Sequence, residues 1–354
     1  MRGTLPATLQ TMVDLSDIAR RLATPPCGIL AADESVASAD KRLASYGIKG
    51  GEEMRRAYRD LFLATKGIEA YLSGVILFEE TLKQKDYKDG IPSKKIDHLP
   101  FPELLQKRGI MAGIKVDQGT EPMEGSPDEL ITGGLLGLSK RLHEYREKHG
   151  TTFTKWRAVV TIDGDRLPSA GAIVENAKRL AMSARCIQEA GMVPILEPEV
   201  LYEGKHSRKR AREVIEETLG ALMHTLGEHG VDHSGVIIKT SMALSGKGTK
   251  KKDTPEEVAE DTVGALIAAV PRDIAGIVFL SGGQEDDQAT DNLRAIAQVA
   301  KAKNAPWPLT FSYARTLQDE ALQIWGGKEE NLPVAREAFL ARLVKVSRAA
   351  EGLD

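Results

Sequence analysis

The chain is poor in the residues that mark several specialised protein classes. Only two cysteines, Cys27 and Cys186, occur in 354 residues, and neither belongs to a Cys-x-x-Cys pair. This excludes a disulfide framework and makes the reducing cytoplasm the expected location. No apolar run approaches the roughly 18 residues of a membrane span. The N-terminus has no apolar signal core, so we expect neither a membrane anchor nor a targeting segment.

Basic surfaces and metal ligands are also scarce. A net charge of -3 excludes a basic footprint for nucleic acid, and we interpret the basic runs 205–212 and 247–252 as solvated helix and loop residues rather than a polyanion site. His224, His229 and His233 are spaced five and four residues apart, which does not keep all three on one helix face. We therefore expect no metal and no other cofactor.

Eight short runs rich in Val, Ile and Leu alternate with longer segments of helical period. This alternation is typical of βαβ units on a parallel sheet. Because no linker or change of composition divides the chain, we predict an α/β fold with a single (β/α)8 barrel domain over residues 1–354, with a doubly wound open sheet as the alternative. The predicted strands are 28–33, 71–78, 109–116, 156–162, 192–197, 235–240, 275–280 and 308–313.

Three other segments have distinct patterns. The stretch 170–190 predicts a helix that begins behind the capping residue Ser169 and ends at Gly191. Residues 83–108 are polar and rich in proline, and we interpret them as an excursion between the second and third strands with a short helix near its end. Residues 332–350 predict an extra amphipathic C-terminal helix.

Charged residues gather where the predicted strands end, which is the working face of such a barrel. Lys239 ends the sixth strand; burial would favour its neutral, nucleophilic amine, although a lysine reaching out of a strand end explains it equally well on its own. Glu197 and Glu199 are two residues apart, so both face the barrel interior. Lys239 can offset them, as can Lys155 and Arg157, which open the fourth strand. The alternative is an ionic layer that only fills the barrel. This is a weaker explanation, because apolar residues in place of such a layer would make the protein equally or more stable.

The loops after the seventh and eighth strands predict a phosphate site. Ser281, Gly282 and Gly283 allow main-chain N–H groups to approach a ligand closely, and Ser312 and Arg315 follow in the next unit. The glycine pair alone indicates only a turn. Together with Arg315, it favours phosphate binding, because barrels commonly bind phosphate at these two loops.

A second cationic group lies on the other side of the same rim. Ser35, Ser38 and Arg42 follow the first strand and Lys115 lies on the third, although Arg42 alone is typical of a surface residue. Two phosphate sites on either side of a buried lysine would suit a substrate with a phosphate at each end.

Seven segments carry a resemblance to a known family over nearly the whole chain, from about Leu15 to the last helix. They are GILAADES (28–35), GVILF (74–78), GIKVD (113–117), KWR (155–157), EPE (197–199), FLSGGQ (279–284) and FSY (311–313). In this order they resemble the class I, Schiff-base-forming fructose-1,6-bisphosphate aldolases.

The resemblance implies reversible cleavage of fructose 1,6-bisphosphate to dihydroxyacetone phosphate and glyceraldehyde 3-phosphate, a step of glycolysis and gluconeogenesis. Lys239 would form the imine without a metal. Glu197 would be the acid and base of imine formation, with Glu199 hydrogen-bonding nearby. Lys155 would favour the neutral amine of Lys239, because a like charge disfavours protonation. Asp33 would accept the C4 hydroxyl proton as the carbon–carbon bond breaks.

The resemblance also implies binding roles and an assembly. The phosphate of the ketone half would be held by Ser281, Gly282, Ser312 and Arg315, and the far phosphate by Ser35, Ser38, Arg42 and Lys115, with Arg157 adding charge. The partners implied are small sugar phosphates and further copies of the chain in a cytoplasmic homotetramer, with no nucleic acid and no membrane.

The sequence departs from the family pattern in three places. Thr240 and Ser241 replace the Pro-Asn or Pro-Ser that usually follows the lysine, and Ala314 replaces a glycine before Arg315. The chain ends in residues 351–354, Glu-Gly-Leu-Asp, without the terminal tyrosine that assists proton exchange in many members. In that case either another group assists proton exchange, or proton exchange is slow.

Other functions fit part of the pattern. A metal-dependent aldolase would need a histidine cluster, and a transaldolase-like enzyme would share the lysine without needing both phosphate sites. A class I aldolase that prefers sedoheptulose bisphosphate or fructose 1-phosphate remains an alternative. A barrel that only binds phosphorylated metabolites would need none of Asp33, Lys155, Glu197 and Lys239.

Overall fold

Eight parallel strands form a closed barrel in the computed structural model, which describes residues 14–90, 92–95, 97–250 and 252–354. Residues 1–13, where the sequence predicts no targeting segment, lie outside the described residues, as do Ile91 and Ile96 of the excursion and Lys251 of a basic run. The barrel order is β1 (Gly28–Ala32), β12 (Leu309–Tyr313), β11 (Gly276–Phe279), β10 (Ile237–Thr240), β9 (Val193–Val200), β8 (Phe153–Val160), β5 (Met111–Lys115) and β2 (Leu72–Leu77). The predicted barrel is confirmed, and the open sheet is excluded.

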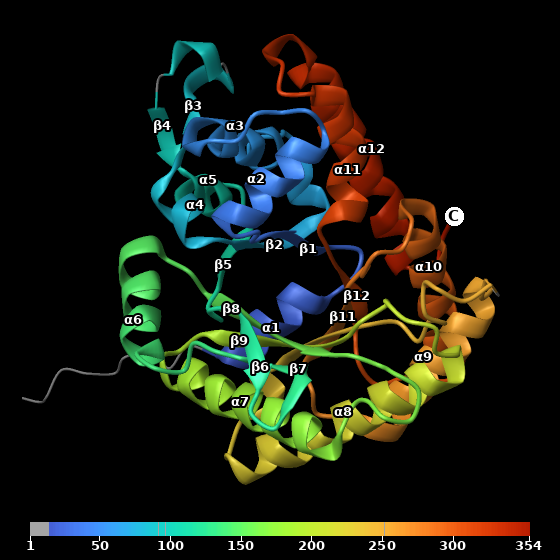
Figure 1. Ribbon diagram of the computed structural model, residues 1–354. Coiled ribbons are helices and arrows are strands. Elements are labelled where there is room, and N and C mark those ends of the chain that lie inside the picture. Colours follow the sequence, from blue (N-terminus) through green and yellow to red (C-terminus); the bar gives the residue numbers. More distant parts are fainter. Residues whose placement is uncertain (1–13, 91, 96, 251) are drawn as a thin grey trace, which may run out of the picture.

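Helices surround the strands, and α1 (Leu15–Ala23) is seen at the centre of this ring (Figure 1). The outer helices are α2 (Val36–Ser45), α3 (Glu52–Leu63), α4 (Glu79–Lys83), α5 (Phe101–Lys107), α6 (Leu138–His149), α7 (Ala170–Glu189), α8 (Arg208–Glu228), α9 (Pro255–Ala269), α10 (Asp286–Ala302), α11 (Arg315–Trp325) and α12 (Leu332–Ala350). Short 3-10 turns are η1 (Ile68–Ala70), η2 (Lys88–Gly90), η3 (Pro92–Lys94), η4 (His233–Gly235) and η5 (Glu329–Asn331).

The predicted helix ends reflect local chemistry. The Ser169 hydroxyl accepts a hydrogen bond from the main-chain N–H of Ala172 at 3.1 Å and begins α7. After the helix, Gly191 adopts a left-handed φ of 71°, which glycine tolerates without a side-chain clash. The predicted C-terminal helix is confirmed as α12.

The barrel interior has its own apolar core, separate from the layer between strands and helices. Alternate strand residues such as Ile195, Ile237 and Val278 pack there, together with Leu22 of α1. Side chains two residues apart on a strand share a face. The same inward-facing rows that begin with these apolar residues therefore continue into the charged residues further along each strand.

Six of the predicted strands agree with the observed ones within two residues at each end, and two differ by three residues at one end. Strand β8 begins at Phe153, three residues before the predicted start, and β9 continues to Val200 instead of ending at Glu197. Lys155 and Arg157 therefore lie within a strand rather than at its opening, and Glu199 is also a strand residue. Charged side chains on the inward face hid these strand residues, because an apolar run is the signal that sequence reasoning follows.

The segment 83–108 lies between barrel strands β2 and β5. It contains the antiparallel strands β3 (Lys85–Tyr87) and β4 (Asp97–Pro100), followed by α5. The fully buried Asp60 of α3 connects it to the C-terminal helix: its carboxylate accepts from the Tyr87 N–H at 3.1 Å and pairs with Arg336 of α12 at 2.7 Å.

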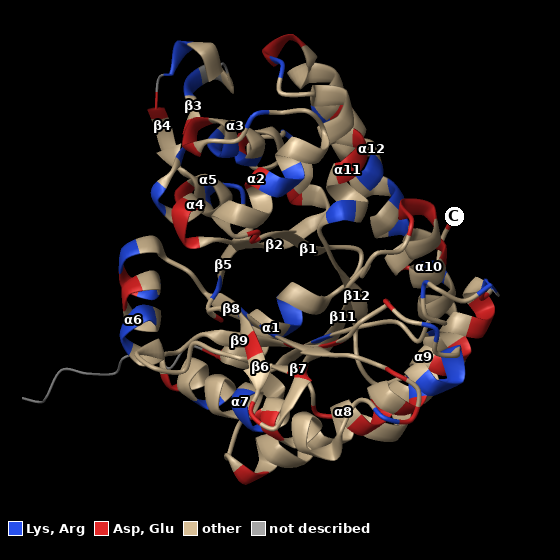
Figure 2. Ribbon diagram, in the orientation of Figure 1, with Lys and Arg blue, Asp and Glu red and all other residues tan. Residues whose placement is uncertain are grey.

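A hairpin of β6 (Thr120–Met123) and β7 (Ser126–Thr132) follows β5 and was not predicted. Its turn contains Gly125 with φ of 79°. On the outer helices, basic and acidic residues are interspersed (Figure 2). Within the described residues, none of the helices is both long and apolar enough to cross a membrane.

Candidate active site

Charged side chains meet inside the barrel at the carboxyl ends of the strands. Lys155 and Arg157 belong to β8, Glu197 to β9 and Lys239 to β10, and Asp33 directly follows β1. Each continues an inward-facing row whose earlier members are apolar, such as the residues of the interior core. The prediction that alternate residues of these strands face one interior is confirmed.

Four of these side chains contact one another in a row in which positive and negative charges alternate. Lys239 Nζ lies 2.9 Å from Glu197 Oε1, and Lys155 Nζ lies 3.3 Å from Glu197 Oε2. Lys155 Nζ also lies 2.8 Å from Asp33 Oδ2. The side chains of both lysines are 5% exposed, so these charges interact with little screening by water.

The surroundings shift the pKa values of Asp33, Glu197 and Lys155 so that the charged form of each is favoured. Burial alone would raise the pKa of Asp33, but the charges of Lys155 and Lys239 outweigh burial and lower it. Burial would likewise raise the pKa of Glu197, and the two lysines again hold it below its ordinary range. For Lys155 burial opposes the charged form, yet the carboxylates around it raise its pKa. Both acids are therefore ionised at neutral pH.

Two further ion pairs line the same end of the barrel. Arg157 Nε lies 2.5 Å from Glu199 Oε2, and Lys115 Nζ donates to Asp117 Oδ1 at 2.5 Å and to its carbonyl oxygen at 2.8 Å. Sequence reasoning assigned no role to Asp117. The available signal was its position two residues after Lys115, which places both on one side of an extended chain.

Some buried polar atoms at this site have no hydrogen-bond partner among the described residues. Glu197 Oε2 has only the ion-pair contact to Lys155, and Ser312 Oγ has none. Buried polar groups in native proteins are normally hydrogen-bonded. The Ser312 hydroxyl is therefore available to a polar ligand, and Glu197 Oε2 can accept a hydrogen bond in addition to its ion pair.

A cavity of about 700 Å³ opens beside these groups. Asp33, Ser35, Ser38, Lys115 and Arg157 line it. Its size is in the range of small-molecule sites. The structure thus brings the predicted groups of the first, third and fourth strands to one cavity.

The predicted phosphate residues of the last two units also lie together. Gly282 and Gly283 have left-handed φ values of 40° and 83° directly after β11, where Ser281 is buried. Arg315 begins α11, and a Cβ built on Gly283 would lie 3.8 Å from its NH2 atom. Arg315 has no ion-pair partner in the described part of the chain, so its charge is available to an anion.

Arg42 is more engaged than Arg315. Its NH1 lies 2.8 Å from Glu34 Oε1 and its NH2 lies 2.5 Å from Asp319 Oδ1. Ser35 caps α2, and its hydroxyl donates to Ser38 Oγ at 3.0 Å. The role of Arg42 at the far phosphate stays a prediction.

Two of the departures from the family pattern fit the local structure. The Ser241 hydroxyl donates to the Val200 carbonyl at 2.8 Å, which ties the loop after Lys239 to the end of β9. Ala314 has φ of -109°, outside the left-handed region that favours glycine. Neither replacement places a non-glycine residue at a positive φ.

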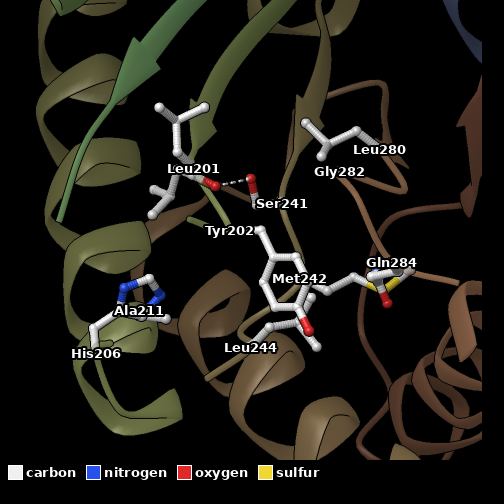
Figure 3. Close-up of a pocket in the computed structure, with 11 residues that line it drawn as sticks. Leu201, Tyr202, His206, Ala211, Ser241, Met242, Leu244, Leu280, Gly282 and Gln284 are labelled. Carbon is white, nitrogen blue, oxygen red and sulfur yellow. Dashed lines mark hydrogen bonds between the residues drawn. The ribbon is translucent and has the colours of Figure 1, made fainter. Parts of the chain in front are cut away.

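A separate small cavity of about 10 Å³ lies beneath the loops after β9, β10 and β11 (Figure 3). Tyr202, Ser241, Met242 and Gln284 are among the residues drawn around it. A volume of this size holds about one water molecule, so a sugar phosphate does not fit. Among the described residues, no group of three or more His, Cys, Asp and Glu side chains is arranged to hold a metal ion.

Comparisons with known proteins agree with this geometry. Residues 14–353 match the family model of class-I, glycolytic fructose-bisphosphate aldolase. A probable fructose-bisphosphate aldolase class 1 of Xanthomonas axonopodis pv. citri is 46% identical over 339 residues, covering 96% of this chain and 97% of the relative. Fructose-bisphosphate aldolase C of Homo sapiens is 45% identical over 340 residues, covering 96% and 90%.

A solved structure of fructose-bisphosphate aldolase from Plasmodium falciparum, in complex with TRAP and a small-molecule inhibitor, has a TM-score of 0.91 and 39% identity to this chain. The match covers 98% of this chain and 97% of that one. The resemblance seen in the sequence is thereby confirmed. The chain belongs to the class I fructose-bisphosphate aldolases, lyases that cleave fructose 1,6-bisphosphate through a Schiff base.

Proposed function

We propose that Lys239 is the residue that forms the Schiff base. The observation that carries this proposal is the buried contact of Lys239 Nζ with Glu197 Oε1 at 2.9 Å, inside a closed barrel. A primary amine next to a carboxylate can lose its proton to that carboxylate and then attack the ketone carbon of the substrate. The new N–C bond converts the ketone to a carbinolamine.

Glu197 manages the protons of these first steps. Its lowered pKa keeps it ionised and able to accept the ammonium proton. It then returns a proton to the carbinolamine hydroxyl, which leaves as water and produces the iminium. Lys155, 3.3 Å from Glu197 Oε2, supports the ionised form, while Glu199 holds Arg157.

Asp33 serves the cleavage step. Its carboxylate accepts the proton of the C4 hydroxyl, and the electrons of the C3–C4 bond move into the iminium to form an enamine. Glyceraldehyde 3-phosphate leaves, and protonation and hydrolysis of the enamine with one water release dihydroxyacetone phosphate. The pKa of Asp33 is lowered by Lys155 and Lys239 despite burial, so the base is ready at neutral pH.

Two phosphate sites flank this chemistry. Ser281, Gly282, Ser312 and Arg315 bind the phosphate of the ketone half, supported by the Ser312 hydroxyl and the Arg315 guanidinium, for which the described residues offer no hydrogen-bond or ion-pair partner, respectively. For the far phosphate we propose Ser35, Ser38, Arg42, Lys115 and Arg157, four of which line the large cavity. A substrate with a phosphate at each end fits both sites.

We also propose that the chain acts as a cytoplasmic homotetramer, as the family resemblance implies. Val174 on α7 is 60% exposed and lies on a groove of about 570 Å³ together with Met123 and Ile131 of the β6–β7 hairpin. Exposed apolar surface of this kind favours contact with another protein surface. Both cysteines are free thiols, which suits a reducing compartment.

The test of Lys239 is chemical trapping. Dihydroxyacetone phosphate or fructose 1,6-bisphosphate is added with sodium borohydride, with and without EDTA, and the adduct is located by peptide mass mapping. We expect a triose-phosphate adduct on Lys239 that EDTA does not affect and that Lys239→Met abolishes. Lys247→Met, a change in an exposed loop residue, should leave trapping unchanged. An adduct elsewhere, or none, would reject the role of Lys239.

A further inference from the structure

Glu34, the residue after Asp33, uses its whole carboxylate in buried contacts. Its Oε1 accepts from Arg42 NH1 at 2.8 Å and from the Tyr58 hydroxyl at 2.9 Å. Its Oε2 accepts from Arg59 NH1 at 2.6 Å. The loop that contains Glu34 directly follows β1 and also contains Asp33, the proposed general base.

Arg59 donates two hydrogen bonds to Glu34. While NH1 donates to the Glu34 side chain, NH2 donates to the Glu34 main-chain carbonyl at 3.0 Å. Arg59 is only 3% exposed, and its guanidinium lies 4.9 Å from the centre of the Tyr58 ring. A planar guanidinium with two donors in a fixed geometry restrains both the backbone and the side chain that it binds.

Asp33 and Glu34 are consecutive, and their contacts lie on opposite sides of the chain. Asp33 contacts Lys155 inside the barrel, whereas Glu34 contacts Arg59 on α3, outside the barrel. Consecutive side chains of an extended segment point to opposite faces. Restraint of Glu34 on the outside therefore sets the direction of Asp33 on the inside.

The contacts continue from Glu34 to α11. Arg42 donates through NH1 to Gln318 Oε1 at 2.8 Å and through NH2 to Asp319 Oδ1 at 2.5 Å. Helix α11 begins at Arg315, the proposed phosphate ligand. The loop of Asp33 and the helix of Arg315 are thus joined through one buried network.

The network is ionised and balanced in charge. Burial alone would raise the pKa of Glu34, but the charges of Arg59 and Arg42 outweigh burial and lower it. Glu34 and Asp319 offset the two guanidinium groups. A buried ion pair of this kind contributes little net stability compared with apolar packing, so its retention beside Asp33 calls for another explanation.

We infer that Arg59 and Glu34 form a clamp that positions Asp33 for carbon–carbon bond cleavage. Arg59 is buried on α3, and both carboxylate oxygens of Glu34 are occupied by protein donors, so we assign both as positioning residues; the inference rests on the proposed role of Asp33 as the base. The clamp acts on one step only. Imine formation uses Lys239 and Glu197, whereas cleavage uses Asp33, so loss of the clamp slows cleavage and leaves imine formation unchanged.

The experiment compares these two steps in Arg59→Met. We expect kcat for cleavage of fructose 1,6-bisphosphate to fall at least about 10-fold, because small misplacements of a catalytic group cost one to two orders of magnitude. Borohydride trapping of Lys239 with dihydroxyacetone phosphate should stay within about twofold of wild type, since that triose has no C4 hydroxyl. Equal loss in both assays would overturn the inference.

Arg55→Met is the matched control. Arg55 lies one turn earlier on α3, is also buried, and pairs with Asp40 at 2.9 Å and Glu80 at 2.6 Å, without contact to Glu34. The Arg55→Met change therefore also removes from α3 a buried arginine that has two carboxylate partners. A cleavage defect as large as that of Arg59→Met would show that general loosening of α3 is the cause and would reject the clamp.

Two more variants keep the test decisive. If Arg59→Met does not fold, Arg59→Lys retains the charge but not the two-point grip, and we expect an intermediate kcat with normal trapping; wild-type kcat would reject the clamp. Asp33→Asn tests the base itself. If Asp33→Asn cleaves fructose 1,6-bisphosphate normally, the proposed role of Asp33 is wrong. If Asp33→Asn is defective but the Arg59 variants cleave normally, only the clamp is wrong.

Discussion

Glu197 lies between two buried lysines and contacts each through a different oxygen. Lys239 is 2.9 Å from Oε1, and Lys155 is 3.3 Å from Oε2. The sequence predicted a direct effect of one lysine charge on the other. In the structure the carboxylate of Glu197 contacts both amines, and the direct effect of Lys155 on Lys239 stays a prediction.

This arrangement makes a prediction for Glu197→Gln. The amide keeps the shape of the side chain but cannot accept the ammonium proton or return a proton to the carbinolamine. We expect the rate of borohydride trapping with dihydroxyacetone phosphate to fall by about 10² to 10⁴, the usual contribution of a general acid and base. Glu199→Gln, which disturbs only the pair with Arg157, should lower it much less. Equal effects would contradict the assignment.

At the scale of elements, an aromatic ring of one strand occupies the space beside a glycine of the neighbouring strand. Gly113 of β5 pairs in register with Phe153 of β8, and a Cβ added to Gly113 would overlap the Phe153 ring. The ring fills the space that the missing side chain leaves. Close packing of this kind leaves no room for an added methyl group.

Gly113→Ala should therefore destabilise the barrel by about 1–3 kcal/mol, the typical effect of overpacking. Thermal unfolding followed by circular dichroism measures the effect. The double variant Gly113→Ala with Phe153→Leu should recover part of the loss, because the smaller side chain releases the overlap. A double variant that is less stable by the sum of both single losses would show that the ring is not the obstacle.

The C-terminal helix is connected to α3 through the ion pair of Arg336 and the fully buried Asp60. Burial raises the pKa of Asp60 from its ordinary 3.8 to about 6, although Arg336 opposes the shift. The folded protein therefore holds this proton more tightly than the unfolded chain. The contribution of Asp60 protonation to the stability of the fold is complete below pH 3.8 and is lost as the pH rises through 6.

Arg336→Met leaves the buried carboxylate without a counter-charge. We expect a loss of about 3–5 kcal/mol at neutral pH, with a smaller loss near pH 4, where Asp60 is protonated. Unfolding midpoints at pH 4, 6 and 8 measure this trend. Arg342→Met on the same helix, whose partner acids Asp287 and Glu320 are more than half exposed, should cost about 0–1 kcal/mol at each pH. A loss independent of pH would contradict the role of Asp60.

At the scale of the whole molecule, exposed apolar side chains favour self-association. Val174, at 60% exposure, borders the groove between α7 and the β6–β7 hairpin. If the groove is an assembly surface, Val174→Asp places a charge that the interface cannot solvate. The variant chain should then fold normally but assemble less.

Light scattering coupled to size exclusion tests this expectation. We expect wild type to elute at about four times the chain mass of 38.5 kDa and Val174→Asp to elute at a lower mass with an unchanged circular dichroism spectrum. Ile267→Asp, a change in an exposed apolar residue of α9 at 47% exposure, is the comparison. A tetramer that persists in Val174→Asp would place the interface elsewhere.

The sequence by itself determined the barrel and the face on which the chemistry lies. Strand and helix periods are local properties, and the alternation of side chains along a strand puts Glu197 and Glu199 on one side without knowledge of any other segment. The segment 28–35 and the loop after β11 likewise identify the family from short stretches of chain. These features depend only on neighbours in sequence.

The tertiary structure alone decided which charges meet. Arg42 pairs with Asp319, 277 residues away along the chain, and Arg59 holds Glu34 from a different helix. Such pairs depend on distances across the fold, which no local pattern encodes. The same reason explains why the early start of β8 and the β6–β7 hairpin were missed: their charged and polar residues become favourable strand residues only where the folded barrel supplies a partner.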